Sequence, residues 1–331
     1  MVMDRISGII PYNKCFYYNC FHSHLFPIIE KNRGNCTLFL ANGIPYFQIQ
    51  TNETSKRILV RFAFQSDYTV LLAQQGISVR KFSASDWKQV LDKALLNEEP
   101  VIVGVDGWYL DYRDDLYHKI HWPHTLLIFG VDQSNKTYLA IDQPTRENMQ
   151  FSEWTLTSHV LESAYEGFCK QKGHDPLFSA DEMILFHFEG NPDPCTAKEI
   201  AIFWHKNRKM QRMKIFQGLY KLAEFKCYLM NCLDMSSSSS DACAFVLEGL
   251  NDIVKQKRWE VFFLKYLLPS HENCANIAQN LLNYWSNIRN LVGYVFLSGY
   301  SRKKTVQHIY EKYEIVLKTE REYAVLAEEE V

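Results

Sequence analysis

The stretch HWPHTLLIFGVDQSNKTYLAIDQP, residues 121–144, contains two runs of apolar and β-branched residues separated by the polar turn QSNK. This pattern predicts an antiparallel hairpin with strands at 125–132 and 137–142. His124 stands at the mouth of the first strand and Asp142 ends the second. Because the open ends of a hairpin lie side by side, we expect these two side chains to be near neighbours.

Further strands are predicted on either side of this hairpin. The runs PVIVGVD (100–106) and MILFHFE (183–189) have the same β-branched and aromatic character. The segment 83–99 has apolar residues at helical spacing, with Ser85 or Asp86 as its N-cap. The first half of the chain therefore has the pattern of an α+β domain.

The pattern changes after GNPDPC (190–195), which contains one glycine and two prolines. Beyond it, helical spacing continues almost to the end, interrupted by the polar segment SSSSSDACAF (236–245), where Asp241 is a candidate cap for the next helix. We predict an α+β domain over residues 1–192 and an all-helical domain of roughly four helices over 193–331.

Composition narrows the class of protein. The 331 residues are 47% hydrophobic with a net charge of −2, so nothing global indicates a nucleic-acid partner. No apolar run approaches the roughly 18 residues of a membrane span, and the first residues lack the apolar core of a signal peptide. The nine cysteines are scattered. Free thiols in the cytoplasm are expected.

A cysteine enters an apolar run in YYNCFHSHLFPIIEKNRG, residues 17–34. If Asn19 caps a helix here, Cys20 lies in its first turn, where unpaired N–H groups and the helix dipole stabilise a thiolate. Gly34 is a suitable stop, whereas Pro27 disfavours an unbroken helix. The alternative is that Cys20 is a small buried hydrophobic residue, as most free cysteines are.

Cys20 and the hairpin together form a candidate catalytic set. A carboxylate at Asp142 can accept the Nδ1–H of His124 and leave Nε2 free to act on the thiol. Cysteine, histidine and aspartate then serve as nucleophile, base and orienting group. Each residue also has a structural explanation when it is considered alone. His124 could be an ordinary histidine at a strand end, and Asp142 an ordinary turn residue.

These motifs, taken in order as NC with its helix, PVIVGVDGWYLDY, HTLLIFGVD and AIDQP, resemble the N-terminal domain family of butirosin biosynthesis protein H over roughly residues 10–190. That family is similar to papain-like cysteine peptidases in fold. It transfers an acyl group from an acyl carrier protein thioester to an amine of an aminoglycoside. The resemblance implies Cys20 as nucleophile, His124 as base and Asp142 as orienting group.

The resemblance also implies a function and its partners. We expect an acyltransferase of antibiotic, nonribosomal peptide or polyketide biosynthesis that uses an acyl or peptidyl carrier protein and passes the acyl group to a small-molecule amine or cyclises it. The phosphopantetheine belongs to the carrier, so no further cofactor is expected. Two alternatives stay open: a cysteine peptidase or thioesterase, and a non-catalytic module that binds a carrier protein or peptide.

The donor for the oxyanion is not specified by the sequence. Papain-like peptidases often supply a glutamine about six residues before the nucleophile. Here that position is Lys14, and the nearest amides are Asn13 and Asn19. These two asparagines are the candidates.

The segment WYLDYRDDLYHKIHW (108–122) is rich in aromatic and acidic residues and lies just before His124. Such a loop could contact a cationic acceptor, or it could pack its rings on the core. The basic run KNRKMQRMK (206–214) is either a docking face for an acidic carrier protein or a solvated helix face. The candidate substrate-binding residues are Asp106, Trp108, Tyr109 and Tyr112.

A metal site is the main chemical alternative. Histidines and cysteines cluster in two places, but no CxxC pair exists, and His22 and His24 point to different faces of a helix. Cys15 is a rival nucleophile with no helix start after it. We therefore expect no metal, and prefer Cys20 to Cys15.

Overall fold

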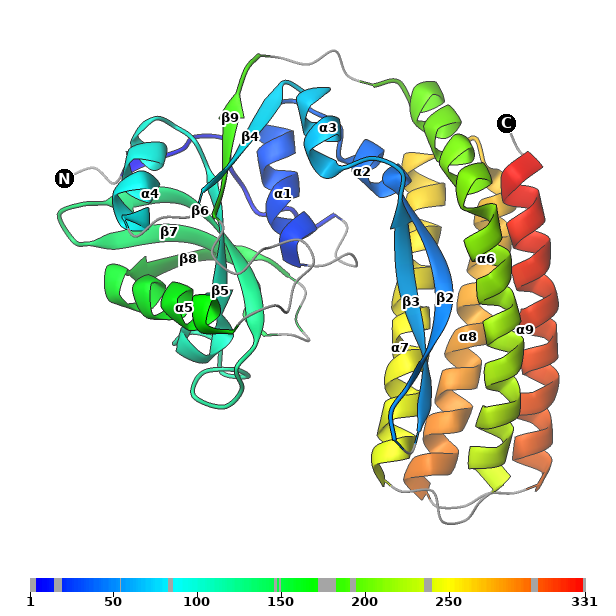
Figure 1. Cartoon of the computed structure of the whole chain (residues 1–331). Helices are drawn as coiled ribbons and strands as arrows, with labels where there is room; N and C mark the ends of the chain where they lie inside the picture. The colour runs from blue at the N-terminus through cyan, green and yellow to red at the C-terminus, as the bar shows by residue number, and fades with distance from the viewer. Residues whose placement is uncertain are drawn as a thin grey trace. The chain divides into compact units, whose positions relative to one another are not determined.

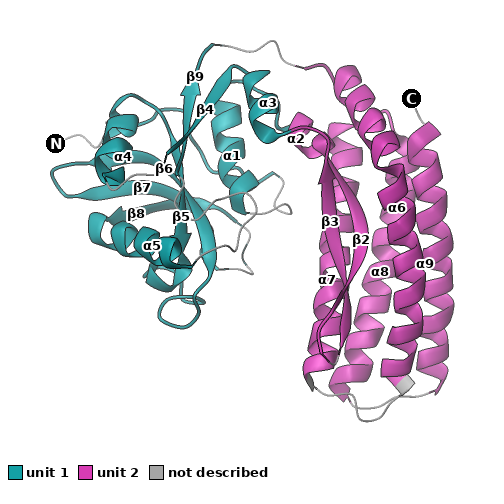
Figure 2. Cartoon of the chain, viewed as in Figure 1, with its two compact units in different colours: residues 1–36, 67–194 teal, residues 37–66, 195–331 magenta. Residues whose placement is uncertain are grey.

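The computed structural model describes residues 4–14, 20–53, 55–82, 86–145, 148, 150–171, 183–190, 195–234, 240–298 and 303–329. The chain forms two compact units (Figures 1 and 2). Unit 1 contains residues 1–36 and 67–194, and unit 2 contains residues 37–66 and 195–331. A single boundary near residue 192 therefore does not account for residues 37–66, which belong with the C-terminal helices.

Unit 1 is built on an antiparallel sheet. Among the described residues the sheet has seven strands, in the order β4-β9-β5-β6-β7-β8, with β1 paired to β6. The strands are β1 (Asp4–Arg5), β4 (Ile77–Phe82), β5 (Val101–Asp106), β6 (Pro123–Asp132), β7 (Thr137–Asp142), β8 (Ser152–Thr157) and β9 (Met183–Phe188). The strands predicted near 100–106 and 183–189 are confirmed.

The predicted hairpin is confirmed as β6 and β7. Leu127 lies opposite Ile141, and the register shifts by a bulge between Ile128 and Gly130. Asp132 closes the turn, where its carboxylate accepts hydrogen bonds from the backbone N–H groups of the residues that follow it. Strand β6 is buried almost throughout and lies between β5 and β7 in the sheet.

Helices surround this sheet. They are α1 (Cys20–Lys31), α3 (Tyr68–Ala73), α4 (Trp87–Leu96), α5 (Ser158–Lys170) and the 3₁₀ turn η1 (Gly107–Tyr109); α2 (Cys36–Asn42) leads into unit 2. Helix α4 is shorter than predicted. Asp86 stands at its N-cap without a side-chain capping bond, and Ser85 lies outside the described residues. Helix α5 packs on β5, where Gly104 leaves room for the ring of Phe168.

Helix α1 ends in a way that the sequence predicted only in part. The helix ends at Lys31, and the N–H of Gly34, the predicted stop, donates to the carbonyl of Ile29 at 2.9 Å. The residue in the left-handed region is Arg33, with φ +57°, rather than the glycine. Gly34 is needed for space, because a Cβ there would overlap Oε1 of Gln75. Pro27 is accommodated within the helix.

Unit 2 contains the predicted helical region. Its described helices are α6 (Ala197–Asp234), α7 (Ser240–Phe262), α8 (Glu272–Ser298) and α9 (Lys303–Glu329), with a π-helical turn η2 (Phe263–Leu267) after α7. Asp241 lies within the first turn of α7. Within the described residues, no helix combines the length and apolar character needed to cross a membrane.

A β-hairpin from the predicted N-terminal domain belongs to unit 2. Its strands β2 (Gly43–Thr51) and β3 (Lys56–Phe64) pair antiparallel and lie along α6 and α7 (Figure 1). Two helical glycines permit this close approach. A Cβ at Gly218 would lie 2.7 Å from the backbone N of Phe47, and one at Gly249 would lie 2.6 Å from the carbonyl O of Ile58.

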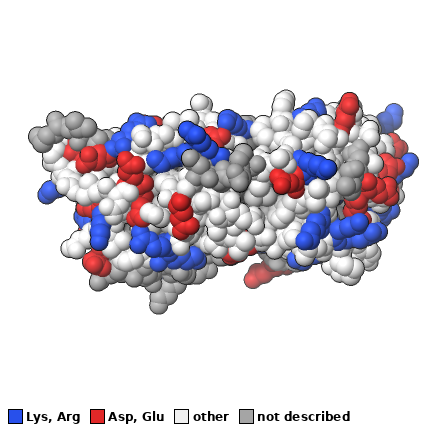
Figure 3. Space-filling view, turned by 90° about the horizontal axis from the view of Figure 1, so that it is seen from above, with Lys and Arg blue, Asp and Glu red and all other residues white. Residues whose placement is uncertain are grey.

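Unit 2 contains a buried group of charged side chains, whereas other charged side chains lie on the surface. In unit 2, Lys257 is buried between Glu260 and Glu320, with Nζ–Oε2 distances of 3.0 and 2.9 Å. On the face shown in Figure 3, basic side chains alternate with acidic ones. The single lysine is shared by both carboxylates, and burial raises the pKa of Glu320 despite this contact.

Candidate active site

Cys20 is the first residue of α1 and is half-buried. The backbone N–H groups of a first helical turn have no acceptor within the helix, and they carry the positive end of the helix dipole. They therefore favour a thiolate at this position. Asn19 and Cys15 lie outside the described residues.

The hairpin brings His124 and Asp142 together. His124 lies in β6 opposite Val105 of β5, and Asp142 is the last residue of β7. Their contact joins Nε2 of His124 to Oδ1 of Asp142 at 2.6 Å. We expected Nδ1 to face the carboxylate. In the structure Nε2 does so, which leaves Nδ1 as the nitrogen for Cys20.

Cys20 and Asp142 both act on the protonation of His124. Burial disfavours the imidazolium, but the charge of Asp142 and that of Cys20, each with a hydrogen bond to the ring, raise the pKa of His124 to about 9. A histidine with this pKa is protonated at neutral pH, and an imidazolium at this place would stabilise a Cys20 thiolate. A cysteine beside a histidine and an aspartate is the residue set that nucleophilic catalysis by a thiol requires.

Asp142 is held by donors from several elements. Its Oδ2 accepts the Tyr112 hydroxyl at 2.5 Å and Arg113 Nη1 at 3.3 Å, and its Oδ1 accepts the Gln143 backbone N–H at 2.7 Å. Burial opposes ionisation of Asp142, but His124 and Arg113 hold its pKa below the usual value. The carboxylate therefore stays charged and fixed beside the imidazole.

Tyr112 was predicted to bind substrate. In the structure its hydroxyl serves Asp142, and its ring stacks on Trp154 with a centroid distance of 4.3 Å. The indole of Trp154 donates to the Asp142 carbonyl at 3.2 Å. Burial and the adjacent carboxylate raise the pKa of Tyr112 well above its ordinary value, so this group donates its hydrogen. Tyr112 thus helps to hold Asp142 in place.

Arg113 is a residue of the site that sequence reasoning missed. It is completely buried, and its Nη1 lies 3.3 Å from Asp142 and 3.4 Å from Nε2 of His124. Its Nε donates to Oδ1 of Asp115 at 3.1 Å. The only sequence signal was a cation within the aromatic, acidic run before His124, and such a position is usually exposed.

His24 is a second neighbour that the sequence indicated only as a candidate metal ligand. Its Nδ1 is 2.9 Å from the Thr125 hydroxyl, and its Nε2 is 4.0 Å from Oδ1 of Asp142. Burial lowers the pKa of His24 to about 3, which keeps this ring neutral. Among the described residues, no group of three or more histidines, cysteines and acids is arranged to hold a metal ion.

Asn13 makes a paired contact with the chain beside the site. Its side-chain amide donates to the Phe151 carbonyl at 3.0 Å, and its carbonyl accepts the Phe151 N–H at 2.8 Å. Phe151 in turn packs against His24, with ring centroids 5.3 Å apart. The amide predicted as an oxyanion donor thus positions the Phe151 segment. Lys14 pairs with Glu30.

The remaining predicted binding residues lie in the loop after β5. Asp106 is completely buried, and its carboxylate accepts the backbone N–H groups of Trp108 and Trp122 and contacts Nδ1 of His121 at 2.6 Å. These contacts show that Asp106 shapes the loop. Trp108 stacks on His121 with centroids 4.4 Å apart, and Tyr109 is half-buried beside it.

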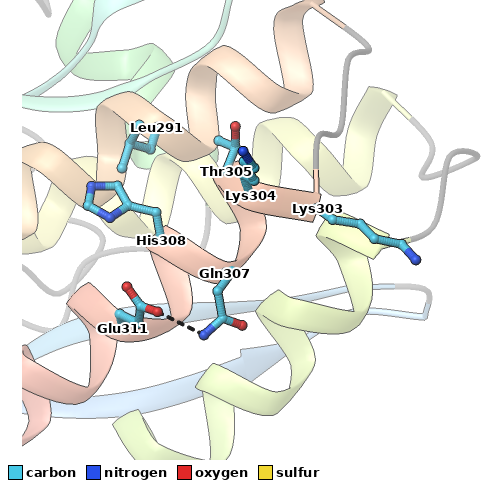
Figure 4. A pocket seen from close by; sticks show the side chains of 7 residues that line it. All are labelled: Leu291, Lys303, Lys304, Thr305, Gln307, His308 and Glu311. Carbon is cyan, nitrogen blue, oxygen red and sulfur yellow. Dashed lines mark hydrogen bonds between the residues drawn. The ribbon is translucent and has the colours of Figure 1, made fainter.

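Unit 2 contains a pocket that is lined by residues of α8 and α9. It lies at the start of α9, where Gln307 donates to Glu311 one turn further along the same helix at 2.9 Å (Figure 4). Leu291, Lys303, Lys304, Thr305 and His308 complete its lining. The residues that line it include no cysteine. No protein-family model matches the chain, and no curated protein is similar enough to count as a relative.

Proposed function

We propose that this protein is an acyltransferase that carries an acyl group on Cys20. The observation that supports this most directly is the contact of His124 with both Cys20 and Asp142. A helix that carries a cysteine, beside an antiparallel sheet that carries histidine and aspartate, is also the arrangement implied by a papain-like fold. The sequence resemblance to the butirosin biosynthesis protein H family points the same way and supplies the substrate class.

In the first step the Cys20 thiolate attacks the carbonyl carbon of an acyl thioester. A new bond forms between that carbon and Sγ, and the bond to the carrier's sulfur breaks. The departing thiolate takes the proton from the His124 imidazolium, so charge and protons balance. Backbone N–H groups at the start of α1 are suited to hold the oxyanion of the tetrahedral intermediate.

In the second step an amine attacks the acyl-enzyme. The amine gives a proton to His124, which is now neutral, and the bond between the acyl carbon and Sγ breaks. Cys20 returns as a thiolate beside the imidazolium, and the product is an amide. Asp142 keeps the imidazole oriented through both steps, because Nε2 never leaves it.

Thioesters fit this site better than peptides do. A thiolate is a good leaving group and needs only the proton of His124, whereas a peptide amine leaves poorly without strong acid assistance. We therefore propose a carrier protein with a phosphopantetheine-bound acyl or peptidyl group as donor, and a small-molecule amine as acceptor. The acyl chain could also be cyclised by an amine of its own. Antibiotic or related secondary metabolism is the setting that the resemblance implies.

The test is mass spectrometry of the intact protein after it is mixed with acyl carrier protein thioesters. An adduct of the acyl mass is expected on the wild-type protein and on Cys169→Ala, because Cys169 is a half-buried cysteine of the same unit outside the site. The adduct is expected to be absent from Cys20→Ala. Added amine should remove it and yield the amide.

Other outcomes would assign a different function. Cleavage of peptides, with no adduct from any thioester, would reverse the order of the two enzyme classes. Loss of the adduct to water at the same rate with and without amine would indicate a thioesterase. Tight binding of the carrier protein by Cys20→Ala and wild type alike, without any adduct, would identify a binding module.

A further inference from the structure

Arg113 places a full positive charge beside a histidine that is itself positive in the resting site. Its guanidinium nitrogen Nη1 is 3.4 Å from Nε2 of His124. Because Nε2 gives its hydrogen to Asp142, that nitrogen has no lone pair for Arg113 to donate to. The contact between the two cations is therefore repulsive, and it is held in place by the bonds from Arg113 to Asp142 and Asp115.

The resting site tolerates this repulsion because Cys20 supplies a negative charge. The Cys20 side chain stabilises the imidazolium through its charge and a hydrogen bond. Acylation converts the thiolate into a neutral thioester and removes that stabilisation. With Asp142 alone beside it, the His124 left neutral by the first step would readily take up a proton again, and a protonated histidine cannot accept a proton from the incoming amine.

We propose that Arg113 is a positioning residue that acts in two ways. It holds Asp142 in place, and it opposes the positive charge of His124, so that His124 gives up its proton once Cys20 carries an acyl group. The consequence for amine transfer rests on the proposed function, whereas the electrostatic coupling does not.

The charged and titratable groups around His124 come from every neighbouring element. Helix α1 contributes Cys20 and His24, and β7 contributes Asp142. The loop after β5 contributes Tyr112, Arg113 and Asp115. His24 stays neutral, because burial lowers its pKa to about 3, and Tyr112 stays protonated. The positive charge of Arg113 thus offsets the negative charge of Asp142. Asp115, which also pairs with Arg113, reduces the effect of that positive charge on His124.

The test uses full-length protein whose Cys20 has been alkylated with iodoacetamide. The product is a neutral thioether, which imitates the neutral sulfur of an acyl-enzyme and requires no carrier protein. Histidine-selective NMR then follows the titration of His124, assigned with His124→Asn. In the alkylated wild-type protein His124 is expected to titrate at least about one pH unit below its value of about 9 in the free enzyme.

Two substitutions should move the titration of the alkylated protein in opposite directions. Arg113→Gln keeps a hydrogen-bond donor but removes the charge, so the pKa of His124 should rise by about one pH unit. Arg113→Lys should bring it back toward wild type. Asp115→Asn frees the charge of Arg113, so the pKa should fall by a few tenths of a pH unit.

The outcomes separate this inference from the proposed function. An unchanged titration of His124 after alkylation, or a shift of the same sign in Arg113→Gln and Asp115→Asn, would overturn the role of Arg113. If Arg113→Gln does not fold, the titration of His124 in the alkylated wild type and in Asp115→Asn still tests the role of Arg113, because Asp115 is only half-buried and its substitution is mild. A protein that passes these tests but forms no acyl adduct would retain the coupling and lose the transferase assignment.

Discussion

Nε2 of His124 and Oδ1 of Asp142 lie 2.6 Å apart, although the two residues are separated by eighteen positions in the chain. The hairpin of β6 and β7 makes this contact, because it returns the chain to the same end of the sheet. Burial excludes water from both side chains. The interaction is therefore strong enough to fix the imidazole and to favour its protonated form.

Cys20 should be the first cysteine to react with iodoacetamide at pH 6. An ordinary thiol is only about 0.3% thiolate at that pH, whereas a thiolate paired with imidazolium is mostly ionised. His124→Asn should therefore slow alkylation of Cys20 by roughly a hundredfold. The measurement is peptide mapping of the label over time, with Cys169 as the internal reference. Labelling of Cys20 at the rate of Cys169 would contradict an activated thiolate.

Asp142→Asn should reduce acyl transfer by roughly 10²–10⁴-fold, because an amide no longer holds the imidazole in the required tautomer. It also removes one of the two carboxylates that the buried Arg113 contacts, which should cost about 1.5–3 kcal/mol of stability. Enzyme kinetics and urea unfolding measure the two effects. The half-buried turn residue at the other end of the hairpin gives the matched control, since Asp132→Asn should change neither the rate nor the stability by a comparable amount. Full activity of Asp142→Asn would remove it from the site.

Acid should destabilise unit 1 through two buried histidines. Burial lowers the pKa of His22 and of His24 to about 3. The unfolded chain binds these protons near pH 6.5, so stability is lost as the pH falls from about 6.5 toward 3, at about 1.4 kcal/mol per pH unit for each group. His22→Phe should reduce the dependence of the unfolding free energy on pH by about 1.4 kcal/mol per pH unit, as measured by urea unfolding between pH 7 and 4. The exposed His159→Gln is the control, and an equal slope in both variants would contradict the assignment.

Two glycines of unit 2 should respond oppositely to alanine. In a helix interior, alanine is favoured over glycine by about 1 kcal/mol. Gly293→Ala in α8 should show this gain, because its nearest neighbour, Leu247, is 3.7 Å from the new Cβ. Gly218→Ala should instead destabilise, since its Cβ would lie 2.7 Å from the backbone of Phe47. Thermal unfolding of both variants is the measurement. A stabilised Gly218→Ala would show that β2 does not lie against α6.

The sequence alone was sufficient for features that depend on neighbours along the chain. Runs of apolar and β-branched residues specified the strands around 125–142, and helical spacing specified the helices after residue 196. The same reasoning placed Cys20 at a helix start, and hairpin geometry placed His124 near Asp142. These three residues of the site could thus be named from local patterns.

The tertiary structure decided what depends on distant packing. No periodicity shows that Arg113 is completely buried or that Nε2 of His124 faces the carboxylate, because both follow from how the loop after β5 folds over the hairpin. Nor did strand propensity assign residues 37–66 to a unit. The pattern of a half-buried hairpin is the same whether a sheet or a pair of helices covers it. Only the contacts of β2 and β3 with α6 and α7, which Gly218 and Gly249 permit, settle which surface does so.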